Sequence, residues 1–317
     1  MSANVETMFY VSNEENNRFV PWHGLGTSVE EALCSAEALE KAGLDWEVLQ
    51  EDVIVDENVV PGYKANVRSS DKSVLGIVTD RYKIVQNKEA FDFTDNLIGT
   101  GDVRYETAGS LRNGKTVWML AKLPPVSILG DQVDPYICFS NSHDGTGSIK
   151  VCMSPVRVVC NNTLNFALST ATRSWSTKHI GDISSKMEEA RETLKMANKY
   201  MSSLSAEAER LANEKISNEE IQKILDELFP VDEEDSDRKK ANKQDAKDGI
   251  MVCYYAPDIA KFMGTKYGLL NAIADWCGHA TPKRMTSDYA SNNWGRIMDG
   301  HPIFDKAYAL CTAKSAA

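Results

Sequence analysis

One stretch of the chain combines basic, amide and aromatic side chains and contains no carboxylate. From Gly145 through Gly181, 37 consecutive residues include no Asp or Glu, although the 317-residue chain carries 46 of them and a net charge of -11. A region cleared of acids lets an anion approach an otherwise acidic protein. The side chains that could meet that anion are Lys150, Arg157, Arg173, Trp175, Lys178 and His179.

These residue types are typical of a path for single-stranded nucleic acid. Cations contact phosphates, and an aromatic ring such as that of Trp175 stacks on a base, which typically contributes about 1–3 kcal/mol per base. Arg81 and Lys83 could extend the basic surface, because alternation along a strand puts both on one face and Tyr82 on the other. The alternative for the acid-free stretch is an ordinary surface with solvated basic residues. The alternative for Arg81, Tyr82 and Lys83 is a strand with one solvent-exposed face and one buried face.

Three asparagines follow Arg157 on a segment that we expect to be helical, at Asn161, Asn162 and Asn165. Asparagine is unfavourable inside a helix because its amide competes for backbone hydrogen bonds. Two roles could offset that cost. The amides of Asn161 and Asn162 could contact phosphates, or the three could form a buried network that fixes the helix to the sheet.

No catalytic motif stands out. Ser142, His143 and Asp144 have the side chains of a hydrolase triad, but neighbouring residues on a turn rarely point at one another, and triads are assembled from distant segments. Asn, Asp, Ser and Gly are also the residues that tight turns favour. The sequence contains no P-loop, dinucleotide-binding glycine motif, H-E-x-x-H or EF-hand loop. We therefore expect no cofactor, no metal and no enzyme.

The composition is that of a globular protein, with 42% hydrophobic and 26% charged residues. No apolar run approaches the length of a membrane span, and the first residues lack the basic and apolar regions of a signal peptide. We expect a cytoplasmic protein of a bacterial host. The seven cysteines include no C-x-x-C pair, which favours reduced thiols. Cys277 and His279 could supply two metal ligands, but nothing nearby completes a set of four.

The pattern of elements predicts an α+β fold in three parts. Residues 1–181 form a mixed α/β half with antiparallel hairpins and a central helix, residues 182–248 a charged amphipathic helical segment, and residues 249–317 a C-terminal helical subdomain. We expect strands at 46–55, 63–68, 74–78, 82–85, 103–110, 116–123, 136–140 and 148–153. We expect helices at 28–44, 87–98, 155–171, 182–213, 218–229, 267–276, 293–298 and 304–311.

Two hairpins are predicted from their turns. Asn113-Gly114 joins the strands at 103–110 and 116–123, and Asn-Gly is preferred where both central residues need positive φ. The second turn, at 143–147, joins the strands at 136–140 and 148–153. The charge pattern of residues 232–240 predicts an exposed loop or the solvated start of a helix.

Six segments carry a resemblance to a known family: Pro21–Gly26 (PWHGLG), Val78–Asn87, Tyr105–Leu111, Ser140–Gly145, Pro155–Leu164 and Asn271–Trp276. With these segments the sequence resembles the phage/plasmid-like protein family of unknown function, which implies a mobile-element origin but no chemistry. A looser similarity in layout, a β-rich half leading into a helix and basic residues, is to the single-strand annealing proteins of phage recombination.

The leading hypothesis is a protein that binds single-stranded DNA and promotes annealing or protects strands. It would act as a homo-oligomer, because one short basic stretch gives few phosphate contacts and assembly multiplies them. The helix at 182–213 is a candidate subunit contact, although an intramolecular helix pair would explain it equally. The alternative is a host-takeover or anti-defence factor that binds a host protein through acidic residues 232–237.

Overall fold

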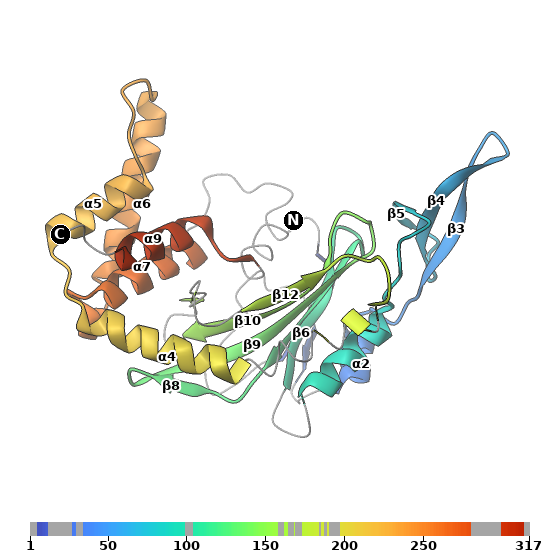
Figure 1. The fold of residues 1–317 in the computed structure, drawn as a ribbon, viewed down its shortest axis with the longest axis horizontal. Coiled ribbons are helices and arrows are strands. Elements are labelled where there is room, and N and C mark those ends of the chain that lie inside the picture. The colour runs from blue at the N-terminus through green and yellow to red at the C-terminus, as the bar shows by residue number, and fades with distance from the viewer. Residues whose placement is uncertain are drawn as a thin grey trace.

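The fold is of the α+β class, with antiparallel sheets in the N-terminal half and helices mainly in the C-terminal half, as predicted (Figure 1). The computed structural model describes residues 5–11, 27–29, 34–98, 104–157, 162–163, 168, 173–183, 185–186, 189, 197–279 and 299–313.

The main sheet is built around two predicted hairpins, which the structure confirms. In the first turn Arg112, Asn113 and Gly114 all have positive φ, of 54°, 58° and 80°. All pairings in the sheet are antiparallel except that between β1 and β2. The strand order is β11 (Asn162–Thr163), β10 (Ile149–Arg157), β9 (Asp131–Ser142), β7 (Thr116–Lys122), β6 (Arg104–Leu111), β1 (Val5–Val11) and β2 (Thr27–Val29), with β12 (Ser174–Thr177) on β10 and β8 (Val126–Ile128) on β9.

A second sheet of three strands stands out from one end of the main sheet (Figure 1). It consists of β3 (Val48–Val55), β4 (Asn58–Arg68) and β5 (Val74–Thr79), paired antiparallel in that order, and we call it the arm. The helices α1 (Ser35–Lys41) and α2 (Asn87–Ile98) flank it in sequence and contact each other. The predicted strands at 46–55, 63–68 and 74–78 and the helix at 87–98 are thereby confirmed.

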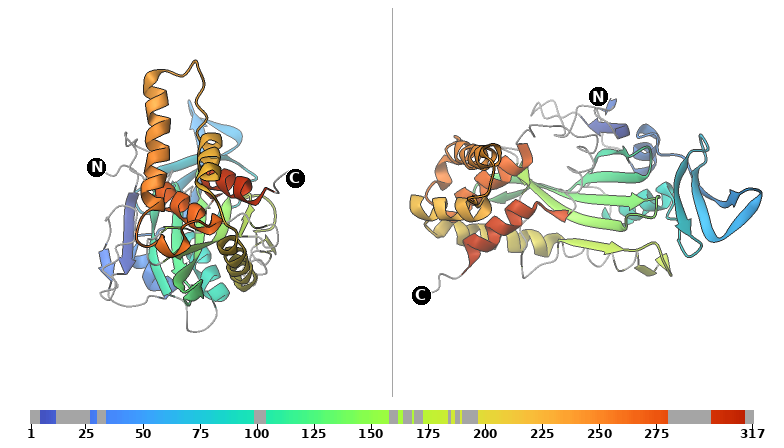
Figure 2. Two further views of the ribbon diagram at one scale, coloured as in Figure 1. Left: turned by 90° about the vertical axis from the view of Figure 1, so that its left-hand side faces the viewer. Right: turned by 90° about the horizontal axis from the view of Figure 1, so that it is seen from above.

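The helical half lies at the end of the molecule opposite the arm (Figure 2). The predicted helices at 218–229, 267–276 and 304–311 are confirmed, and the one expected at 293–298 lies outside the described residues. The elements are α4 (Ala197–Asn213), α5 (Asn218–Leu228), α6 (Asp237–Tyr254), the short 3-10 helix η1 (Ala260–Phe262), α7 (Lys266–His279) and α9 (Pro302–Thr312).

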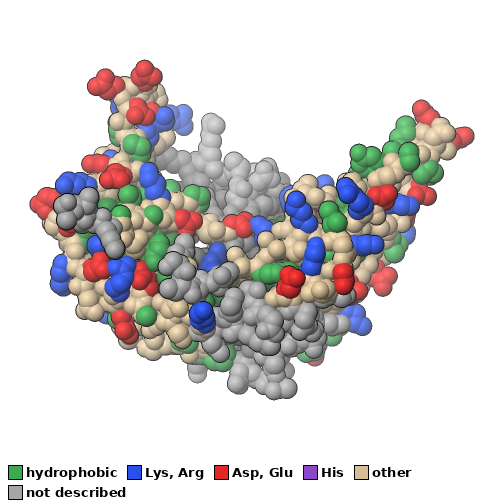
Figure 3. Space-filling model, in the orientation of Figure 1, with side chains coloured by type: hydrophobic (Ala, Val, Ile, Leu, Met, Phe, Trp, Pro, Cys, Tyr) green, Lys and Arg blue, Asp and Glu red, His purple; other side chains and the backbone are tan. Residues whose placement is uncertain are grey.

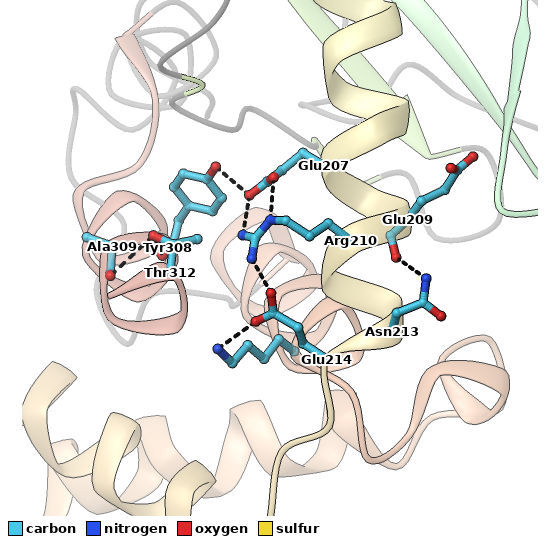
Figure 4. A network of polar contacts seen from close by, with 9 residues as sticks. Glu207, Glu209, Arg210, Asn213, Glu214, Tyr308, Ala309 and Thr312 are labelled. Atoms are coloured by element: carbon cyan, nitrogen blue, oxygen red, sulfur yellow. Dashed lines mark hydrogen bonds and ion pairs between the residues drawn. The ribbon is translucent and has the colours of Figure 1, made fainter. Parts of the chain in front are cut away.

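An ion-pair and hydrogen-bond network joins three of these helices (Figure 4). Arg210 on α4 donates to both carboxylate oxygens of Glu207, at 2.8 and 2.7 Å, and also pairs with Glu214. The hydroxyl of Tyr308 on α9 donates to Glu207 at 2.8 Å, and Lys266 of α7 pairs with Glu214 at 2.8 Å. Helices distant in sequence are thus fixed to one another by polar contacts at the rim of their packed faces.

The apolar face of α4 is buried inside the chain. Tyr200, Leu204, Ala208 and Leu211 are fully buried, and α4 packs against α7. The sequence left open whether the helix at 182–213 makes a subunit contact or an intramolecular one. Burial of the apolar face of α4 favours the intramolecular alternative for residues 197–213.

Three predicted elements differ in the structure. The segment expected to be a helix from Pro155 continues as β10 through Arg157, with Pro155 opposite Pro135 of β9, and Asn162–Thr163 pair back onto β10. Its apolar residues are too continuous for spacing to separate helix from strand, and its valines favour strand. Apart from Leu168, which packs against the core, the remainder of that segment lies outside the described residues.

The other two corrections concern the arm and its neighbours. The helix expected from Ser28 begins only at Ser35, because Thr27–Val29 pair with β1. Residues 82–85 form no strand. The side-chain amide of Gln86 takes the place of a strand partner there: it accepts from the backbone N–H of Val48 at 2.8 Å and donates to the Val48 carbonyl at 2.9 Å.

Candidate nucleic-acid interface

The acid-free stretch is organised around β12 at the edge of the main sheet. Ser176 lies opposite Lys150, and Ser174 lies opposite Cys152. Trp175 lies opposite Val151, a core residue, and packs against the core with its ring half-buried. Trp175 therefore serves the packing of β12 more than it offers a free platform for a base.

Two of the predicted cations are engaged within the protein. The Lys150 ammonium pairs with the Asp299 carboxylate at 2.7 Å, an arrangement on the surface that water and salt weaken. The Arg173 guanidinium donates to the carbonyl of Met153 at 2.8 Å and is half-buried. The side chains of Arg157 and Asn162, and the whole of Asn161, lie outside the described residues.

His179 has a structural role. The residue is 3% exposed, and its ring stacks on that of Tyr82, with centroids 4.5 Å apart and an interplanar angle of 13°. Nδ1 lies 2.9 Å from the carbonyl oxygen of Lys83, so this nitrogen carries the proton and donates. Burial lowers the pKa of His179, although the Lys83 contact partly opposes the shift. The ring is neutral at pH 7 and is not one of the cations.

The Tyr82–His179 stack brings together three exposed cations from distant segments. The backbone N–H of Lys83 donates to the His179 carbonyl at 2.8 Å, which holds residues 81–83 beside residues 178–180. Arg81, Lys83 and Lys178 are exposed there, while Tyr82 between them is buried. None of the ion pairs between described side chains involves these three. We call them the basic trio. Lys and Arg side chains gather on the molecular surface where the arm meets the main sheet (Figure 3).

A buried polar joint lies beside the basic trio, where the arm meets the β9–β10 turn. The His143 ring is fully buried, with Nε2 at 2.9 Å from Oδ1 of Asn87 and its ring edge against Trp46. The Asn66 amide of β4 donates to the His143 carbonyl at 2.7 Å. The Tyr82 hydroxyl donates to the Ser142 carbonyl at 2.5 Å. We call this set the joint.

The Ser142-His143-Asp144 sequence serves the turn and the joint. Asp144 accepts from the Ser142 hydroxyl at 2.6 Å and from the backbone N–H and hydroxyl of Thr146 at 2.9 and 2.7 Å. These bonds lower the pKa of Asp144 against the opposing effect of burial. The His143 ring instead meets Asn87. The sequence treated this segment as a tight turn but gave no signal of its long-range partners, Asn66 and Asn87.

Six cysteines in the described part form no disulfide bond, and Cys138 and Cys152 are buried directly opposite each other on β9 and β10. Cys160 lies outside the described residues. Among the residues that the structure describes, no three His, Cys, Asp or Glu side chains gather as a metal ion would require. No described helix is long and apolar enough to cross a bilayer.

A protein-family model, the domain of unknown function DUF932, matches residues 74–297. This match covers more than half of the chain, so the chain belongs to the DUF932 family. It includes the basic trio, the Tyr82, Asn87, Ser142 and His143 part of the joint and most of the helical half, and it leaves Trp46, Asn66 and the first two strands of the arm outside. No curated protein and no solved structure matches the chain.

Proposed function

We propose that this member of the DUF932 family is a mobile-element protein that binds single-stranded DNA, for annealing or for strand protection. The observation that carries the proposal is the basic trio. The segment that carries Arg81 and Lys83 lies beside the segment that carries Lys178, because the Tyr82–His179 stack and the bond from the Lys83 N–H to the His179 carbonyl hold the two together. The result is a rigidly placed group of exposed cations in a chain of net charge -11.

The surroundings of the trio suit a nucleic-acid backbone more than a small ligand. The exposed Ser174 and Ser176 of β12 continue the surface from Lys178 with hydroxyls, which can donate to phosphate oxygens. Asp80 and Asp182 are exposed nearby in the sequence, so the positive potential is local and does not cover the molecule. We expect binding without sequence preference, because phosphate contacts carry no sequence information.

Charge reversal of the trio is the test. We expect the triple variant R81E/K83E/K178E to lose most binding to a fluorescent single strand of ~40 nucleotides, a length that spans several protein footprints. If the trio makes three phosphate contacts, the wild-type affinity should fall by about 20-fold between 50 and 200 mM salt. Removal of the three contacts should reduce the magnitude of the slope of log affinity against log salt concentration by roughly 2. Fluorescence anisotropy at several salt concentrations measures both quantities.

The matched control reverses three exposed cations in the helical half, Lys215, Lys223 and Arg238, and changes the net charge equally. We expect K215E/K223E/R238E to retain affinity and salt dependence. A wild-type protein that is folded and fails to bind at low salt contradicts the proposal. A pull-down from host extract that depends on acidic residues 232–237 would then support the alternative of a host-protein partner.

A further inference from the structure

Two buried cysteines face each other across neighbouring strands of the main sheet. Cys138 of β9 and Cys152 of β10 are direct partners in the register and are 0% and 1% exposed. The backbone N–H of Met153 donates to the Arg173 carbonyl, on the side of β12. Successive N–H groups along a strand point to opposite sides, so that of Cys152 points toward β9. Partners of this kind have Cα atoms about 5.5 Å apart, inside the range of roughly 4.4–6.8 Å that a disulfide bond spans.

The cysteine pair lies on the face of the sheet that is turned away from the main hydrophobic core. The adjacent residues Phe139 and Val151, on the other face, belong to that core, whereas neither cysteine does. Leu120 of β7 is beside Cys138, but the next residues on this face along β9 and β10 include the buried Ser140 and Ser154. A thiol that serves only as a small apolar side chain is expected in the core. This pair has a more polar setting.

The two thiols differ in how readily they lose a proton. The Cys138 thiol donates a hydrogen bond to the Cys152 sulfur, and the Arg173 guanidinium donates to it as well. These contacts lower the pKa of Cys152 against the opposing effects of burial and of Asp299. Burial and the same thiol–thiol bond raise the pKa of Cys138. The pair therefore combines a sulfur that favours the thiolate, which is the nucleophilic form, with a neighbouring neutral thiol.

Cys152 is separated from solvent by one short strand. β12 lies beside β10 (Figure 1), and its exposed Ser174 is the direct partner of Cys152. β12 is four residues long, and short segments at the edge of a structure open locally at a small cost in free energy. Such an opening brings a small oxidant such as a peroxide to Cys152 while β9 and β10 stay paired.

We propose that Cys138 and Cys152 form a peroxide-sensitive pair that is oxidised to a disulfide bond between β9 and β10. The Cys152 thiolate attacks one oxygen of hydrogen peroxide and the O–O bond breaks, which leaves a sulfenic acid on Cys152. The departing hydroxide takes up the proton that Cys152 had released and becomes water. The Cys138 sulfur then attacks the Cys152 sulfur, the S–O bond breaks, and the Cys138 proton leaves with the hydroxyl as a second water. The two sulfurs together lose two electrons, and the peroxide gains them.

The first experiment treats the reduced, folded full chain with hydrogen peroxide, blocks the remaining thiols with N-ethylmaleimide and maps tryptic peptides by mass spectrometry. Cleavage after Lys150 places the two cysteines on separate peptides. We expect these peptides to be joined, with the loss of two hydrogens, and dithiothreitol to separate them. The control is C253S, which removes a half-buried thiol on α6 and should leave this cross-link unchanged. The readout is a mass, so it does not depend on DNA binding.

The second experiment tests which sulfur attacks the peroxide, using dimedone to capture sulfenic acid. In C138S the serine hydroxyl can still donate to the Cys152 sulfur, and no thiol remains to resolve the sulfenic acid, so we expect capture at Cys152. In C152S we expect capture at Cys138 to be slower by about 10-fold or more, the effect of one pKa unit on the fraction of thiolate. Circular dichroism checks that both variants are folded, and the wild-type experiment needs neither of them.

Three results would overturn the proposal. A folded wild type that keeps both thiols reactive toward N-ethylmaleimide after peroxide treatment, once it is unfolded for labelling, would show that the pair is not oxidised. A cross-link that forms only when peroxide is added in urea would show that the folded sheet shields the pair. Capture at Cys138 in C152S as fast as capture at Cys152 in C138S would show that Cys152 is not the attacking sulfur.

Discussion

Replacing Gly76 with alanine is expected to lower the free energy of unfolding by about 3 kcal/mol, the upper end of the usual cost of overpacking. A Cβ at this position would lie 2.6 Å from Cα of Asp144 and 2.7 Å from its carbonyl oxygen. Both are backbone atoms, so no side chain can rotate away. The turn cannot shift freely either, because Asp144 is held by Ser142 and Thr146.

The matched control is Gly278→Ala in α7, where an added Cβ would meet nothing within 4 Å. Because alanine favours helix over glycine, this variant should be neutral or more stable by up to about 1 kcal/mol. Urea unfolding followed by circular dichroism measures both variants. If G76A unfolds at the wild-type urea concentration, the backbone contact between β5 and the β9–β10 turn does not hold the arm.

The expected effect of G76A follows from how the arm is attached. Gly145, on the other side of the same contact, has φ of 76°, and a Cβ there would lie 2.9 Å from Cγ1 of Val78. Two glycines thus let the backbone of β5 lie directly on the turn. A rigid attachment matters for the proposed function, since it fixes the basic trio beside β12.

Local turn chemistry explains which parts of the fold could be predicted from the sequence. The β6–β7 and β9–β10 hairpins follow from Asn113-Gly114 and from the Asp, Gly and Thr of residues 144–147, whose preferences act over a few residues. The strand at Pro155–Arg157 could not be distinguished from a helix by the spacing of its apolar residues. Its pairing with residues 133–135 of β9 decides that it is a strand, and local spacing does not reveal that pairing.

The candidate site was predictable in composition but not in geometry. Lack of acids identified the region. Arg81 and Lys83 are exposed and Tyr82 is buried, as expected, although the strand from which that expectation came is absent. The sequence also proposed Trp175 and His179 as contacts for nucleic acid, whereas the structure packs Trp175 against the core and stacks His179 on Tyr82. That stack joins residues 97 positions apart, and no spacing rule in a single sequence reveals such a pair.

Acidification from pH 7 to pH 5 is expected to destabilise the fold by about 2 kcal/mol through His143 alone. Burial lowers the pKa of His143 from 6.5 to about 3, and the neighbouring His179 adds to the shift. The folded chain therefore keeps this ring neutral between those values, while the unfolded chain protonates it below pH 6.5. The unfolded state binds more protons, so stability is full above pH 6.5 and declines as the pH falls toward 3.

The measurement is the urea midpoint of the wild type, H143Q and H179Q at a series of pH values between 7 and 5. Glutamine keeps an N–H for the Asn87 oxygen but does not titrate, so H143Q should show a much shallower decline even if it is less stable at pH 7. H179Q should remove a smaller part of the loss of stability between pH 7 and pH 5, because His179 is less completely buried and its contact with Lys83 opposes the lowering of its pKa. Equal slopes in the wild type and H143Q would mean that the joint opens to water before the ring is protonated. The arm would then be released at an acidity at which the rest of the fold persists.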